Sequence, residues 1–174
     1  MKTSAQWWAE VKADPAKFNN WLVKQYRGEV TAAHRIRDIV RQFAPTARYA
    51  QILERIAVQE EQHAEWVLGL LKTRGVEASL DGAEKRYWAA VKDAAVDFST
   101  AAAVGAHAEE MRLERIRVIV ADPDTPADVR EVFGRILPQE VWHASAFTEM
   151  AGPEAMASTK YAHEQGRALL GLVL

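Results

Sequence analysis

The sequence predicts an all-α protein organised around four long helices, and three observations support this fold class. Apolar residues recur every three or four positions over long stretches, which is the spacing of a core-facing helix surface. Signals for strands are scarce, since the one Asp-Gly pair, Asp81-Gly82, lies between two helical patterns. Proline, glycine and capping residues fall between the periodic stretches, where helices are expected to begin and end.

These punctuating residues set the expected boundaries of each helix. Pro15 and Thr46 begin the first two long helices, and Gly75 follows the second. Thr125 is expected to cap the fourth, with Pro126 in its first turn. In order, we expect a short helix at 4–13, long helices at about 15–43, 46–74, 97–120 and 126–150, and a last helix from about 153 to the end.

The lengths of the connections predict how the helices pair. The first two long helices are joined tightly, as are the last two, so each pair is expected to be antiparallel. The longer segment 75–96 is expected to cross between the pairs and to carry a short helix at 83–91. A chain of 174 residues is long enough for one domain, expected over 1–174, with the bundle at about 15–151 and the C-terminal helix at about 153–172.

Composition excludes several classes of protein. With 49% hydrophobic and 26% charged residues the chain is not a disordered one. The absence of cysteine excludes disulfides, thiol nucleophiles, iron–sulfur clusters and cysteine-based zinc sites. A net charge of −2 gives no general attraction to nucleic acid or to an anionic membrane, and neither is expected as a partner. The longest apolar run falls far short of about 20 residues, and the N-terminus does not resemble a signal peptide, so a cytoplasmic location is expected.

Charged residues interrupt the apolar stripe of every long helix near its middle. In the second and fourth helices a glutamate is followed three residues later by a histidine, and residues three apart lie on one helix face. A shift of 80 residues superimposes the first helix pair on the second without a gap, and it also superimposes these polar residues. The matched residues are Glu29 with Glu109, Gln59 with Gln139, Glu60 with Glu140, and His63 with His143.

The matched residues predict a metal site with two ions. Four carboxylates and two imidazoles that converge inside a four-helix bundle are the ligands of di-iron and di-manganese carboxylate proteins. Four buried carboxylates need a compensating positive charge, and two divalent cations would supply it. Oxygen ligands with one imidazole per ion favour iron or manganese over zinc or magnesium. The predicted ligands are Glu29, Glu60, His63, Glu109, Glu140 and His143.

The pattern Glu29…Glu60-x-x-His63…Glu109…Glu140-x-x-His143 resembles the ferritin-like superfamily of four-helix bundles, most of all its rubrerythrin (erythrin) branch. The resemblance implies two iron ions, or a manganese or mixed pair, bridged by Glu60 and Glu140. Glu29 and Glu109 would each bind one ion terminally, as would His63 and His143. It also implies an oxidoreductase that acts on O2 or H2O2 as a peroxidase, oxidase or ferroxidase, with no catalytic residues beyond the metal ligands.

The chain departs from rubrerythrins in two respects. Rubrerythrins carry a rubredoxin-type iron site on cysteines, so this cysteine-free chain would need an external electron donor. They also carry an additional carboxylate one turn after the third-helix ligand, where this chain has Arg112. The six remaining ligands match bacterioferritin equally well.

Residues near the predicted ligands leave some choices open. Glu110 competes with Glu109, although the repeat and the apolar stripe favour Glu109. His34 and His107 are expected at the surface or at helix ends, because neither belongs to a Glu-x-x-His pair. In the superfamily the residue before a bridging glutamate commonly binds the histidine of the facing helix. This would pair Gln59 with His143, and Gln139 with His63.

The sequence also leaves two alternative functions open and suggests an oligomeric state. An iron-storage subunit would need a closed cage, which the chain length and fifth helix permit. Gly28-Glu29-Val30 is similar to the first-helix motif of quinone hydroxylases, which are di-iron monooxygenases. A homodimer is expected, built on an apolar face such as the Trp-rich N-terminus or the Leu-rich tail.

Overall fold

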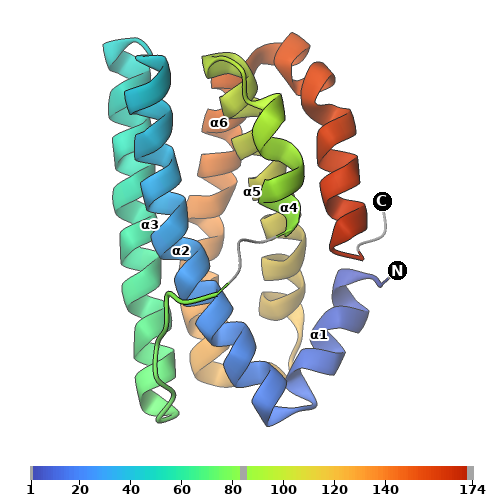
Figure 1. Cartoon of the computed structure of the whole chain (residues 1–174). Coiled ribbons are helices and arrows are strands. Elements are labelled where there is room, and N and C mark those ends of the chain that lie inside the picture. Colours follow the sequence, from blue (N-terminus) through green and yellow to red (C-terminus); the bar gives the residue numbers. More distant parts are fainter. Residues whose placement is uncertain (1, 83–85, 172–174) are drawn as a thin grey trace.

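Local capping interactions begin most of the helices where the sequence predicts them. The computed structural model describes residues 2–82 and 86–171, and in these it contains six α-helices and no β-strand (Figure 1). The Asp14 side chain accepts hydrogen bonds from the N–H groups of Ala16 and Lys17, and Asp97 and Thr100 cap each other's backbone N–H groups. The elements are α1 (Ser4–Lys12), α2 (Pro15–Phe43), α3 (Ala47–Thr73), α4 (Arg86–Val91), a 3-10 turn (Lys92–Ala94), α5 (Phe98–Ala121) and α6 (Ala127–Leu169).

The four long helices form two antiparallel pairs, α2 with α3 and α5 with α6 (Figure 1). The connection after α3 runs back along the bundle and carries α4, so that α5 starts at the end of the bundle opposite to the end of α3 (Figure 1). As a result α3 and α5 run in the same direction. The short helix expected at 83–91 is present from Arg86, and residues 83–85 lie outside the described residues.

Two apolar clusters fill the bundle on either side of its middle. Along α3, Leu53 and Ile56 belong to one cluster, and Val67 and Leu70 belong to the other. The same division occurs along α6, where Phe133 and Ile136 precede the middle and Phe147 and Met150 follow it. The segment between the clusters on each helix contains its Glu-x-x-His pair. The apolar packing therefore holds the polar residues of all four helices at one level, away from solvent.

The packing of α1 contradicts two expectations, one about Thr125 before α6 and one about the Trp-rich N-terminus. Thr125 does not cap α6, since its O–H donates to the carbonyl of Ile119 (2.7 Å) and its oxygen accepts from the Trp8 indole N–H (3.1 Å). The hydroxyl therefore ties α1 to the end of α5. The Trp-rich N-terminus is not an exposed apolar face either, because Trp8 is 1% exposed and its ring lies 5.0 Å from that of Trp21.

The C-terminal part of the chain folds back along the bundle. Gly152 has φ 72° and ψ 167°, and this left-handed φ breaks α6 where the sequence predicts a new helix to begin. The segment after Gly152 packs against α4, and Lys2 N–H donates to the carbonyl of Gly171 (3.0 Å), so the two ends of the chain lie together (Figure 1). None of the helices in residues 2–82 and 86–171 has the length and apolar character needed to span a membrane.

The close approach of α5 to α6 makes a glycine necessary at position 105. A Cβ on Gly105 would lie 2.8 Å from the ring of Phe147, which is buried. Gly105→Ala is therefore expected to lower the free energy of unfolding by about 1–3 kcal/mol in urea denaturation. Gly69 is the matched control, because it lies in α3 with no atom within 4 Å of the added Cβ. Gly69→Ala should raise stability by up to about 1 kcal/mol. A Gly105→Ala protein as stable as wild type would contradict this packing.

Candidate metal centre

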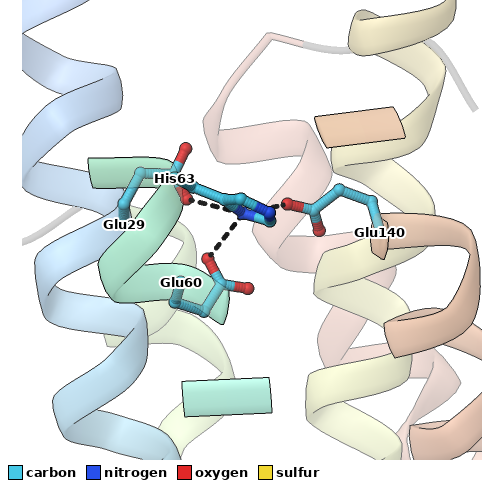
Figure 2. Close-up of side chains that lie close together, drawn as sticks. All are labelled: Glu29, Glu60, His63 and Glu140. Carbon is cyan, nitrogen blue, oxygen red and sulfur yellow. Dashed lines mark ion pairs between the residues drawn. The ribbon is translucent and has the colours of Figure 1, made fainter. Parts of the chain in front are cut away.

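Six side chains from the four long helices meet at the middle of the bundle. Five of them have no exposed surface, and Glu109 is 8% exposed. Figure 2 shows Glu29 on α2 and Glu140 on α6 approaching Glu60 and His63 of α3 from opposite sides. All six predicted ligand positions therefore lie in one cluster, which is completed by Glu109 on α5 and His143 on α6.

The cluster divides into two groups that share two glutamates. One group, the His63 side, consists of Glu29, Glu60, His63 and Glu140, and the other, the His143 side, consists of Glu60, Glu109, Glu140 and His143. In each group four potential ligand atoms lie within 4.8 Å of one another. The 80-residue shift that relates the two halves of the sequence also converts one group into the other.

The oxygens of the two shared glutamates are divided between the two imidazoles. His63 Nδ1 lies 3.2 Å from Glu140 Oε1 and 3.7 Å from Glu60 Oε2. His143 Nδ1 lies 3.2 Å from Glu60 Oε1 and 3.5 Å from Glu140 Oε2. Each shared carboxylate thus presents one oxygen to each side, which is the arrangement needed to bridge two ions.

Hydrogen bonds to glutamine fix the orientation of both imidazole rings. His63 Nε2 lies 3.0 Å from Gln139 Oε1, and His143 Nε2 lies 2.9 Å from Gln59 Oε1. Both of these pairings are the ones expected from the sequence. Because the amide oxygen can only accept, each Nε2 carries the proton, and Nδ1 is left facing the carboxylates.

A cation that the sequence did not place in the cluster is also present. The Arg112 guanidinium reaches in from α5 and forms an ion pair with Glu29. Its Nε lies 3.1 Å from Glu140 Oε1 and its Nη1 lies 3.7 Å from Glu60 Oε2. The position of Arg112 one turn after Glu109 was the available signal, since residues three apart share a helix face.

Burial and neighbouring charges separate the carboxyl groups into two kinds. Burial raises the pKa of Glu29 to about 8, although Arg112 opposes this rise, and burial together with Glu140 and Glu60 raises the pKa of Glu109. Burial also acts on Glu60, but the nearby charges of Arg112 and of both imidazoles outweigh it and lower the pKa to about 2. Without metal, the terminal glutamates therefore hold protons while Glu60 is ionised.

The imidazoles respond to the ionised glutamates. Burial alone would lower the pKa of His63, but the close carboxylates of Glu140 and Glu60 raise it to about 10. The pKa of His143 is raised for the same reason. The metal-free cluster thus balances its negative charge with Arg112, with bound protons and with imidazolium.

The cluster has the properties required to hold two metal ions. Seven of its buried ligand atoms have no hydrogen-bond partner, namely Glu29 Oε2, both oxygens of Glu60 and of Glu140, and Nδ1 of His63 and His143. Buried polar atoms without partners are costly, and a metal would satisfy all seven. Oxygen donors with one imidazole nitrogen on each side suit iron or manganese.

The other candidate residues lie outside the cluster. Glu110 is exposed, which leaves Glu109 as the α5 carboxylate in the cluster, and His34 is exposed as expected. His107 contradicts the expectation, because it is only 7% exposed. Its ring stacks on that of His163 at 4.5 Å, and its Nε2 lies 3.1 Å from the Thr159 hydroxyl oxygen. Contacts with the segment after Gly152, which no Glu-x-x-His pattern reveals, account for its burial.

Comparison with known proteins identifies the family of this bundle. A family model described as rubrerythrin matches residues 20–151, a segment that holds all six clustered residues and both glutamines. Comparisons with curated proteins and with solved structures gave no match. The matched segment begins within α2 and ends one residue before the break at Gly152. The chain therefore belongs to the rubrerythrin family, and its buried carboxylates and histidines fit a di-iron protein.

Proposed function

We propose that the protein is a di-iron oxidoreductase that reduces hydrogen peroxide, or O2, with electrons from an external donor. The observation that supports this most strongly is the pair of four-residue groups that share Glu60 and Glu140. Two bound ferrous ions would supply the two electrons that, with two protons, reduce hydrogen peroxide to two water molecules or O2 to hydrogen peroxide. Because the chain has no cysteine, it cannot hold a rubredoxin-type iron site, and the electrons must come from another molecule.

Each residue of the cluster has a distinct task in this proposal. Glu60 and Glu140 belong to both four-residue groups and would each contact both ions, while Glu29 and Glu109 would each hold one ion. Gln59 and Gln139 keep the imidazole Nδ1 atoms directed inwards. The apolar clusters on both sides exclude water, which strengthens every electrostatic interaction inside the centre.

The choice of oxidant is tested by rapid mixing. The protein reconstituted with Fe(II) under anaerobic conditions is mixed with hydrogen peroxide or with O2, and oxidation is followed by absorbance. We expect hydrogen peroxide to oxidise the bound Fe(II) on the timescale of rapid mixing, with two electrons transferred per chain. Oxidation by neither oxidant would contradict the proposal. Oxidation accompanied by accumulation of a mineral core in a cage-sized particle would favour the iron-storage alternative.

The oligomer and the remaining alternatives stay predictions. Size-exclusion chromatography with light scattering separates a homodimer from a cage. Binding of a quinone to the metal-loaded protein would favour the quinone hydroxylase alternative. In the Leu-rich tail, Leu169 is exposed and Leu170 packs against a buried cluster, while residues 172–174 lie outside the described residues.

The shared glutamates should be indispensable for metal binding. Glu140→Ala removes an oxygen from both groups, so bound iron after anaerobic reconstitution should fall from two per chain to one or fewer. Glu110→Ala is the matched control, because Glu110 is exposed and should leave two irons bound. Metal analysis after gel filtration measures both. Two irons per chain in the Glu140→Ala protein would contradict the bridging role.

Metal binding and metal-free stability should depend on pH with opposite signs. Metals require ionised Glu29 and neutral His63, so binding must release protons, and apparent affinity should increase from about pH 5 to 8. In the metal-free protein both groups have raised pKa values. The stability that they contribute is therefore complete below their unfolded-state pKa values and is lost as pH rises toward the folded-state values.

Calorimetry in buffers of different ionisation enthalpy measures the released protons, and thermal melts with chelator measure the stability. Binding without proton release, or a metal-free protein that gains stability between pH 5 and 8, would contradict these pKa directions.

A further inference from the structure

The two halves of the centre differ at the position of Arg112. The repeat that superimposes the six clustered residues places Arg112 opposite Ala32. Among the described residues, the second half therefore contributes an arginine to the cluster and the first half does not. The ligands are duplicated, but their electrostatic surroundings are not.

The contacts of Arg112 fall on one side of the centre. Its guanidinium pairs with Glu29, which belongs to the His63 side alone. On the shared glutamates it approaches Glu140 Oε1 and Glu60 Oε2, which are the same two oxygens that face His63. Among the described residues, no ion pair within 4.0 Å joins Arg112 to Glu109, or to the oxygens that face His143.

A metal ion on the His63 side would compete directly with this guanidinium. Arginine keeps its charge at any pH at which the protein is folded, so it cannot yield by losing a proton. It has to move, and space is available. Arg112 lines a cavity of about 110 Å³ whose wall includes the small residues Gly28, Ala32 and Ala108, and its side chain is already 20% exposed.

We propose that Arg112 acts as a built-in competitor for one of the two metals. The first metal binds on the His143 side, where, among the described residues, Arg112 forms no ion pair with Glu109 or with the oxygens that face His143. The second binds on the His63 side, and only as Arg112 moves from the carboxylates into the adjacent cavity. This inference rests on the proposed two-metal function and adds an order of binding to it.

The order of binding is measured by titrating the metal-free protein with Co(II), using calorimetry and visible absorbance. Wild type should bind one equivalent tightly and a second about tenfold or more weakly. Arg112→Ala, which makes the position equal to its repeat partner Ala32, should strengthen the second equivalent by about tenfold or more and bring the two affinities together. Arg112→Met keeps more of the side-chain volume and should do the same if the alanine variant is unstable.

Arg115→Ala is the matched control. Arg115 lies on the same helix and lines the same cavity, but it stacks over Trp7, and its charged neighbours among the described residues are Glu114 and Arg167 and not the cluster. It should therefore leave the two-step titration unchanged. His63→Ala should abolish the weak equivalent and retain the tight one, while His143→Ala should abolish the tight one.

The outcomes separate this inference from the proposed function. Two equal affinities in wild type, or a second affinity that neither Arg112 variant changes, would overturn the role of Arg112 while leaving a two-metal centre. Equal effects of the Arg112 and Arg115 variants would overturn it as well. Failure of wild type and both Arg112 variants to bind a second equivalent would instead refute the two-metal function.

Discussion

The burial of four carboxyl groups at the middle of one bundle is the constraint on which the rest of the structure depends. In the unfolded chain each carboxylate would be well solvated by water. In the folded protein all four are buried and lose that solvation. The metal-free protein meets the cost by protonating the terminal glutamates, by charging the imidazoles and by bringing Arg112 into contact with Glu29. Two metal ions would replace all three devices at once. Metal loading would therefore be an exchange of cations and protons at a preformed site.

The arrangement of the helices follows from the same constraint. The crossover between α3 and α5 brings the two halves of a repeated sequence together, so that one shift relates both the helices and the clustered residues. The repeat explains why each of the two shared glutamates faces one imidazole with each oxygen. It does not extend to Arg112, whose partner is Ala32, and the symmetry of the centre is lost at that position. A duplicated site can in this way acquire two unequal halves through a single side chain.

Much of the fold and of the site could be predicted from the sequence because the signals were local or repeated. The boundaries of α2 and α3 follow from Pro15, Thr46 and Gly75, and the cluster follows from helical spacing together with the repeat. The errors concern contacts between segments distant in sequence. Thr125 bonds to Trp8, and His107 is buried by the C-terminal segment, which no local pattern encodes. The sequence shows that Arg112 stands where rubrerythrins carry an additional carboxylate. Only the packed structure shows that the arginine's charge enters the centre.

Anomalous diffraction at the iron edge, from crystals of protein loaded with Fe(II), tests the two-metal centre most directly. Two peaks are expected between Glu60 and Glu140, one within bonding distance of His63 Nδ1 and the other within bonding distance of His143 Nδ1. Arg112 should no longer be paired with Glu29. A single peak, or no peak with the Arg112–Glu29 ion pair intact, would contradict the two-metal centre.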